Sequence, residues 1–279
     1  MTALVRTTVV SGAGTAVPVR LFQPAIPGLG WLVWAHGGSW TSGSAAAWHE
    51  PCEDLARRAD ITVVSVDYRL APIFPYPAAL EDLLAVLAWV ARQPELGHLP
   101  RLLAVGGDSA GATLAASAAL AFRDQGGVLG AQVLAYPPLD PACRAPSYLL
   151  DPLQFPHKES LLAAWRAYAG DQPGIDRAYL APLNVESLHG LAPAIIGVGD
   201  RDPVRDDVRT YAARLQAAGV AVQLRNFAGE GHALFLTRPS FRAWLAAALR
   251  QRFDDVLHLP SAVACASCEA AWSKACIQP

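Results

Sequence analysis

A glycine-rich turn near the middle of the chain joins an apolar segment to a segment rich in alanine and leucine. Residues 101–105 (RLLAV) are short and apolar, which predicts a buried strand, and residues 113–122 predict a helix. The turn between them, GDSAG at 107–111, contains the pattern Gly-x-Ser-x-Gly. In a strand–turn–helix context this pattern holds the serine hydroxyl at the tip of a tight turn, beside the N–H groups of the helix start. Ser109 is therefore a candidate nucleophile, and its alternative role is that of a plain helix cap.

The rest of the chain alternates between segments of strand and helix type. This alternation predicts an α/β fold, a mostly parallel sheet of about eight strands with helices on both faces, in which the first two strands form a hairpin. Strands are expected over 5–10, 16–22, 31–35, 61–66, 101–105, 131–136, 194–198 and 220–227. Helices are expected over 47–59, 77–92, 113–122, 158–168, 204–218 and 239–253.

Two regions depart from this alternation. The first, at about 140–190, is rich in proline and predicts an excursion that forms a partial lid inside one domain spanning 1–253. The second, a tail at 254–279, contains Cys265 and Cys268 as C-x-x-C, with Cys276 nearby. A metal site there needs a fourth ligand, for which His258 is the only nearby candidate, so we expect a loosely held tail without a metal.

The composition limits the classes of partner. Hydrophobic residues make up 53% of the chain and charged residues 16%, which is enough for a sizeable core. A net charge of −2 argues against nucleic acid and against an anionic membrane surface. The sequence has no apolar run of membrane length and no leader pattern, and its five cysteines are an odd number, so we expect a reducing, cytoplasmic location.

A serine nucleophile needs a base, and the base needs a carboxylate to orient it. In this architecture the partners follow the serine in the order acid, then histidine. The expected strand at 194–198 is followed by GDRDP at 199–203, and the expected strand at 220–227 is followed by GEGH at 229–232. Parallel strands gather their carboxyl ends at one edge, so these loops are expected to meet. Asp200 and Asp202 both stay candidates for the acid, since Asp202 before proline also resembles a helix N-cap.

An oxyanion formed at Ser109 would need N–H donors. One is the backbone of Ala110, the residue after the nucleophile. Others are expected in the loop HGGS at 36–39, where two glycines let the backbone turn its N–H groups inward. The alternative for this loop is an ordinary glycine turn.

Five motifs in order resemble the hormone-sensitive-lipase-like branch of the α/β-hydrolases, the bacterial carboxylesterases. They are HGGSW at 36–40, VDYRLAP at 66–72, GDSAGA at 107–112, DPVRDD at 202–207 and GEGHALF at 229–235. The resemblance covers about residues 5–253 and implies an α/β-hydrolase fold and hydrolysis of a small-molecule ester without metal or organic cofactor. It implies the catalytic residues Ser109, Asp202 and His232, choosing Asp202 over Asp200, and the oxyanion donors Gly37, Gly38 and Ala110.

The chain also departs from the family pattern. Ser39 replaces a third glycine, which we expect the oxyanion site to tolerate, and His36 comes so early that the leading cap segment is expected to be missing. We therefore expect a preference for short acyl chains. Amide or formamide hydrolysis by the same residues is one alternative, and a non-catalytic receptor, disfavoured because His232 is present, is another. The sequence is also compatible with a homodimer.

Overall fold

The alternating segments form one sheet of eight strands, in the order β1-β2-β4-β3-β5-β6-β7-β8. The structure is a computed structural model that describes residues 3–258, except 13, 26–27, 95–98, 100–101 and 151–153. Strands β1 and β2 run antiparallel, as do β2 and β4, and every other pair is parallel. The strands are β1 (Leu4–Gly12), β2 (Thr15–Gln23), β3 (Trp31–Ala35), β4 (Thr62–Val66), β5 (Leu103–Asp108), β6 (Ala131–Ala135), β7 (Ala194–Gly199) and β8 (Val222–Phe227). The predicted mostly parallel α/β sheet is confirmed.

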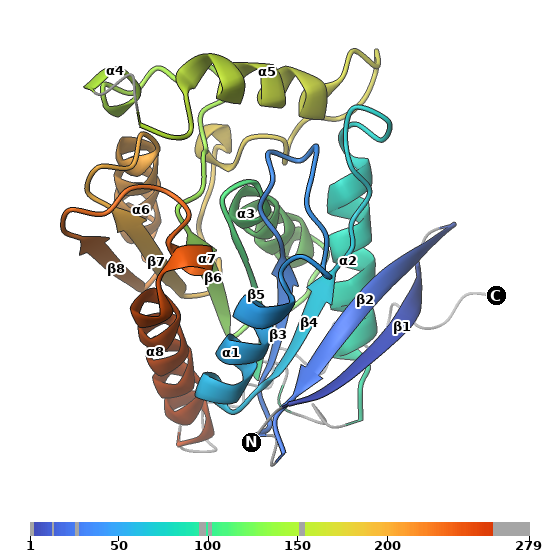
Figure 1. Ribbon diagram of the computed structural model, residues 1–279. Helices are drawn as coiled ribbons and strands as arrows, with labels where there is room; N and C mark the ends of the chain where they lie inside the picture. The colour runs from blue at the N-terminus through green and yellow to red at the C-terminus, as the bar shows by residue number, and fades with distance from the viewer. Residues whose placement is uncertain are drawn as a thin grey trace.

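Helices cover both faces of the sheet, as Figure 1 shows. Helices α1 and α8 pack together on one face, while α2, α3 and α6 lie on the other. The helices are α1 (His49–Ala59), α2 (Ala78–Ala91), α3 (Ala110–Asp124), α4 (Ser147–Leu150), α5 (Lys158–Ala169), α6 (Arg205–Ala217), α7 (Leu234–Thr237) and α8 (Pro239–Leu257), with a 3₁₀ turn η2 (Pro182–Asn184).

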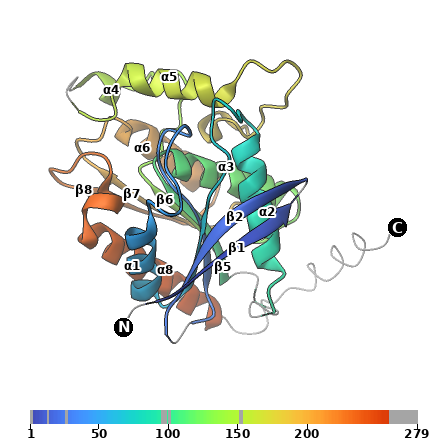
Figure 2. The ribbon, with the colours of Figure 1, turned by 45° about the vertical axis from the view of Figure 1, so that its right-hand side comes forward.

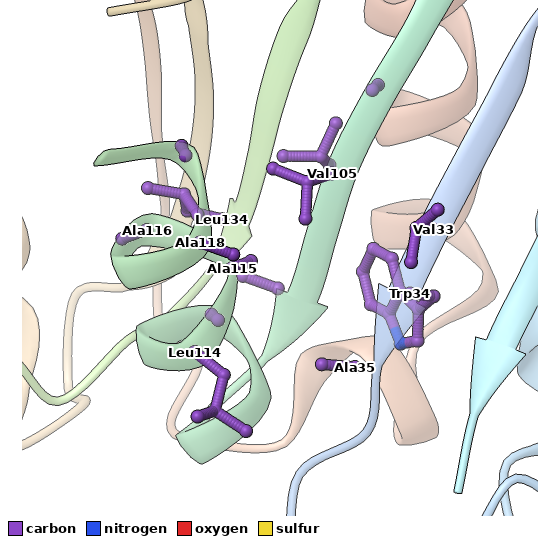
Figure 3. Packing of buried hydrophobic residues seen from close by; sticks show 14 of the residues in the cluster. Val33, Trp34, Ala35, Val105, Leu114, Ala115, Ala116, Ala118 and Leu134 are labelled. Carbon is purple, nitrogen blue, oxygen red and sulfur yellow. The ribbon is translucent and has the colours of Figure 1, made fainter. Parts of the chain in front are cut away.

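Small side chains let α3 approach the centre of the sheet closely. Every residue of α3 from Ala110 to Phe122 is buried, and most of them are alanines. Figure 3 shows Ala115 and Ala118 of this helix beside Val105 of β5 and Leu134 of β6. Because α3 begins directly after Ser109, this packing fixes the position of the nucleophile relative to the sheet.

The sheet register brings three loops to one edge. Ala35 at the end of β3 pairs with Gly107 of β5, and Asp108 pairs with Ala135 at the end of β6. The loops that follow β3, β5 and β6 therefore begin side by side. Strands β7 and β8 continue the same parallel array, so the segments after Gly199 and Phe227 emerge at this edge too.

The excursion at 140–190 carries α4 and α5 across the carboxyl end of the sheet (Figures 1 and 2). Two hydrogen bonds attach α4 to the start of α6: the Tyr148 hydroxyl donates to Asp207 at 2.6 Å, and Ser147 Oγ donates to the Pro203 carbonyl at 2.7 Å. The excursion is thus held next to the loop that follows β7.

Several element boundaries differ from the sequence prediction, most clearly at the ends of β5 and α8. Strand β5 continues through Gly106, Gly107 and Asp108, which were expected in the turn, because β3 and β6 pair with these residues. Helix α8 runs to Leu257, four residues past its expected end and into the predicted tail. The C-x-x-C at Cys265 and Cys268 lies outside the described residues.

Two kinds of feature are absent from the described residues. Within that part of the chain no helix is long and apolar enough to cross a membrane. The same residues contain no group of three or more His, Cys, Asp or Glu side chains arranged to hold a metal ion.

Candidate active site

Ser109 occupies a strained turn between β5 and α3. Its backbone has φ 52° and ψ −123°, a combination that residues other than glycine rarely adopt. The two flanking glycines make the turn possible. A Cβ on Gly111 would lie 2.1 Å from the Ala35 carbonyl oxygen, and one on Gly107 would lie 2.4 Å from the Gly111 carbonyl oxygen. Any side chain at either position would therefore force the turn away from β3.

Ser109, His232 and Asp202 form one continuous hydrogen-bonded line. His232 Nε2 lies 2.9 Å from Ser109 Oγ, and His232 Nδ1 lies 2.7 Å from Asp202 Oδ2. Since a carboxylate only accepts hydrogen bonds, Nδ1 carries the ring proton and Nε2 is left to accept the serine proton. The histidine side chain is 4% exposed and that of Asp202 is fully buried, so water competes little for either bond.

Asp202 has both of the roles that the sequence suggested for it, as the partner of the histidine and as the cap of the turn before α6. Its Oδ1 accepts the Val204 N–H at 3.0 Å, which fixes the turn before α6, while its Oδ2 faces His232. Asp200 is turned away from the histidine, and its Oδ1 accepts the Gly229 N–H at 2.8 Å. The geometry thus brings Asp202, not Asp200, to the imidazole.

The loop after β3 differs from the prediction at Gly37. The Gly37 N–H donates to Asp108 Oδ1 at 3.1 Å in a buried position. The same N–H was expected to face an oxyanion, and in this structure its acceptor is the Asp108 carboxyl. Sequence reasoning missed this contact because it did not consider Asp108, although that residue directly precedes the nucleophile.

The next residues of this loop adopt left-handed backbone conformations. Gly38, Ser39 and Trp40 have φ of 114°, 56° and 60°. None of the hydrogen bonds formed among the described residues uses the Gly38 or Ser39 N–H as donor. Trp40 is fully buried and stacks on Tyr168 of α5, with ring centroids 4.8 Å apart, so the excursion anchors the far end of the loop.

Asp108 is a buried carboxyl beside the nucleophile. Its Oδ1 also accepts the Trp48 indole N–H, at 2.8 Å. Burial raises the pKa of Asp108 to about 7, and the hydrogen bonds from Trp48 and Gly37 oppose that rise without cancelling it. Between about pH 4 and 7 the folded protein therefore holds a proton on this group that the unfolded chain has released.

We expect Asp108→Asn to gain stability relative to the wild type as the pH rises. An amide oxygen can still accept from Gly37 and Trp48, whereas the wild type must bury a charge once Asp108 ionises. Between about pH 4 and 7, the unfolding free energy of the variant should rise relative to that of the wild type by up to about 1.4 kcal/mol per pH unit. Denaturant unfolding of both proteins at several values between pH 4 and 8 measures it, and a difference independent of pH would contradict the account.

Two aromatic rings contact the imidazole of His232. The ring of Tyr136, which follows β6, lies 4.6 Å from it at an interplanar angle of 65°, and the ring of Phe155 lies 5.6 Å away at 68°. Tyr136 is fully buried, and its hydroxyl accepts the Phe235 N–H at 2.9 Å, which holds the segment after His232. The sequence did not lead us to expect either ring against the imidazole. The position of Tyr136 at the end of a strand beside β5 was an available signal. Phe155 is an apolar residue of the excursion and so a candidate for lining a pocket, but no motif indicates its contact with His232.

The fold and the sequence define the class of this protein. The sequence profile of the α/β-hydrolase fold family matches residues 32–236, which include Ser109, Asp202 and His232. The chain therefore belongs to the α/β-hydrolases, in the hormone-sensitive-lipase-like branch that contains the carboxylesterases.

Characterised proteins of this branch resemble the chain over most of its length. It is 39% identical over 226 residues to the carboxylic ester hydrolase LipN of Mycobacterium tuberculosis, covering 77% of this chain and 60% of LipN. It is 35% identical over 234 residues to an ethyl acetate hydrolase of Pseudomonas putida, covering 78% of this chain and 71% of that enzyme. The solved structure of EstE1, a thermostable carboxylesterase cloned from a metagenomic library, superposes with a TM-score of 0.84 at 32% identity, covering 90% of each chain. The chain is thus similar to carboxylic ester hydrolases over most of its own length, and it spans less than two thirds of LipN.

Proposed function

We propose that this protein is a serine carboxylesterase that hydrolyses esters of short-chain acids through an acyl-enzyme. The observation that carries the proposal is the line from Asp202 through His232 to Ser109, with hydrogen-bond distances of 2.7 and 2.9 Å. A hydroxyl, a neutral imidazole and a buried carboxylate in this order are the groups that acyl transfer requires. The ester-hydrolase relatives support the same chemistry.

The reaction follows from the hydrogen bonds. Ser109 Oγ attacks the ester carbonyl carbon while His232 Nε2 takes the hydroxyl proton, and Asp202 stabilises the resulting imidazolium. When the C–O bond of the ester breaks, His232 gives this proton to the departing alcohol. The imidazole then takes a proton from water, which attacks the acyl-enzyme, and gives it to Ser109 Oγ as the bond to the acyl group breaks and the acid leaves.

Backbone N–H groups near Ser109 are the proposed oxyanion donors. The Ala110 N–H opens helix α3 and has no partner inside the helix, and the positive end of the helix dipole favours negative charge there. Gly38 is the second donor, and Ser39 takes the place expected for Gly37, whose N–H is held by Asp108. Removing one such donor typically costs about 3 kcal/mol of transition-state stabilisation.

We expect the rate to peak at butyrate or hexanoate esters. Aromatic side chains fill the volume between the loop at Trp40 and helix α5. The ring centroids of Trp165 and Tyr168 lie 4.4 Å and 4.8 Å from that of Trp40, and all three rings are buried. Each further CH₂ of an acyl chain contributes about 0.8 kcal/mol only where a wall covers it. Measuring kcat/KM for 4-nitrophenyl esters from acetate to palmitate tests this. A maximum at dodecanoate or longer would mean that a long acyl site exists.

A further inference from the structure

Phe155 is the one substantially exposed ring in contact with the imidazole, among the described residues. His232 uses one ring nitrogen for Asp202 and the other for Ser109, and its remaining aromatic contacts are Tyr136 and Phe155. Tyr136 is fully buried and belongs to the interior. Phe155 is 60% exposed, so most of its surface is available to a bound molecule.

The residue before Phe155 also lies close to the histidine loop. The neighbouring Gln154 reaches Gly231, the residue before His232: a Cβ on that glycine would lie 3.2 Å from Gln154 Oε1. Helix α4, which precedes this segment, is itself bonded to the turn after Asp202 through Ser147. Phe155 therefore sits beside the imidazole because its surroundings are attached to the loops of the acid and the histidine.

The chemistry identifies which part of an ester would meet this ring. His232 Nε2 delivers its proton to the alcohol oxygen, so that oxygen must come within hydrogen-bond distance of the imidazole. The first carbons of the alcohol then lie within a few ångströms of the same ring. The carbonyl oxygen instead faces the oxyanion donors, and the acyl chain leaves the carbonyl carbon by a different bond from the alcohol oxygen.

We propose that Phe155 forms a wall of the site for the alcohol part of the ester and gives the enzyme a preference for aromatic alcohols. The inference rests on the proposed esterase function and extends it to the substrate class. Aromatic rings attract one another when their centroids are 4.5–7 Å apart, beyond the effect of buried area. Phe155 is a specificity-determining residue here, since it touches substrate and takes no part in proton transfer.

The test compares two esters of one acid, benzyl butyrate and ethyl butyrate. Both give the same butyryl-enzyme, so the ratio of their kcat/KM values reports the alcohol side alone. For Phe155→Ala we expect the benzyl-to-ethyl ratio to fall about threefold to tenfold relative to the wild type, the range expected for one lost aromatic pair. Phe155→Leu keeps apolar bulk without an aromatic ring, so its benzyl-to-ethyl ratio should fall nearly as far as that of Phe155→Ala. Phe155→Tyr keeps the ring, so its ratio should equal that of the wild type.

Phe74→Ala is the matched control, because Phe74 is 45% exposed and its ring contact is with Arg69 rather than with the triad. It should leave the ratio unchanged. An unchanged ratio in Phe155→Ala, a full ratio in Phe155→Leu, or an equal fall in Phe74→Ala would each overturn the proposal. Absence of turnover of both esters by the wild type would instead overturn the proposed esterase function, and this inference with it.

Discussion

Ser109→Ala and His232→Ala are each expected to lower kcat for a short-chain ester on the order of 10⁶-fold, because the serine and the histidine act as one unit. The 2.9 Å contact between Ser109 Oγ and His232 Nε2 is the path of the proton, and either substitution removes one end of it. The double variant should be no worse than either single variant, since nothing is left for the second change to remove. Steady-state assays with 4-nitrophenyl butyrate measure all three.

These losses should occur in folded proteins. Alanine at 109 removes one oxygen from a site whose backbone is fixed by Gly107, Gly111 and the packing of α3, so the unfolding midpoint should change little. A variant that keeps more than a hundredth of the wild-type rate while folded would show that the nucleophile or the base lies elsewhere.

Asp202→Asn is expected to reduce kcat by about 10⁴-fold, while Asp200→Asn should change it by less than about tenfold. An asparagine amide at 202 can donate to Nδ1, which favours the tautomer with its proton on Nε2, and that tautomer cannot accept the proton of Ser109. At 200 the amide oxygen can still accept the Gly229 N–H, and the imidazole is unaffected.

The two substitutions form a matched pair, because they make the same chemical change two residues apart. The same assay with both variants separates an acid that orients the histidine from a general loss of negative charge near the site. Equal losses, or a larger loss at Asp200, would mean that Asp202 is only the residue that fixes the turn before α6.

The sequence predicts the fold well because the fold depends on local patterns. Short apolar runs alternate with helical segments, and the helices bury the five central strands β3 to β7, so eight strands and their order along the chain can be predicted. The extent of β5 is harder, since Gly106 and Gly107 read as a turn and become strand only through pairing with β3 and β6.

In the candidate site too, local motifs predict the main residues, whereas contacts between distant parts of the chain are not predicted. Ser109, Asp202 and His232 stand at strand ends in motifs, and the structure brings them together. A motif does not determine the direction of a single backbone N–H. The Gly37 N–H points to the carboxyl of Asp108, 71 residues away, because that carboxyl is buried and needs donors. Phe155 reaches His232 through the path of an excursion whose sequence has no period to indicate it.

Mapping the site of covalent modification by an aryl alkylphosphonate ester tests the central claim most directly. Such a reagent resembles the tetrahedral intermediate, and its phosphorus is attacked by the residue that attacks an ester. The account predicts one phosphonyl group per chain, on Ser109, with loss of activity in proportion to labelling and no labelling of the Ser109→Ala variant. Labelling at another residue, or full esterase activity after Ser109 has been modified, would contradict the account.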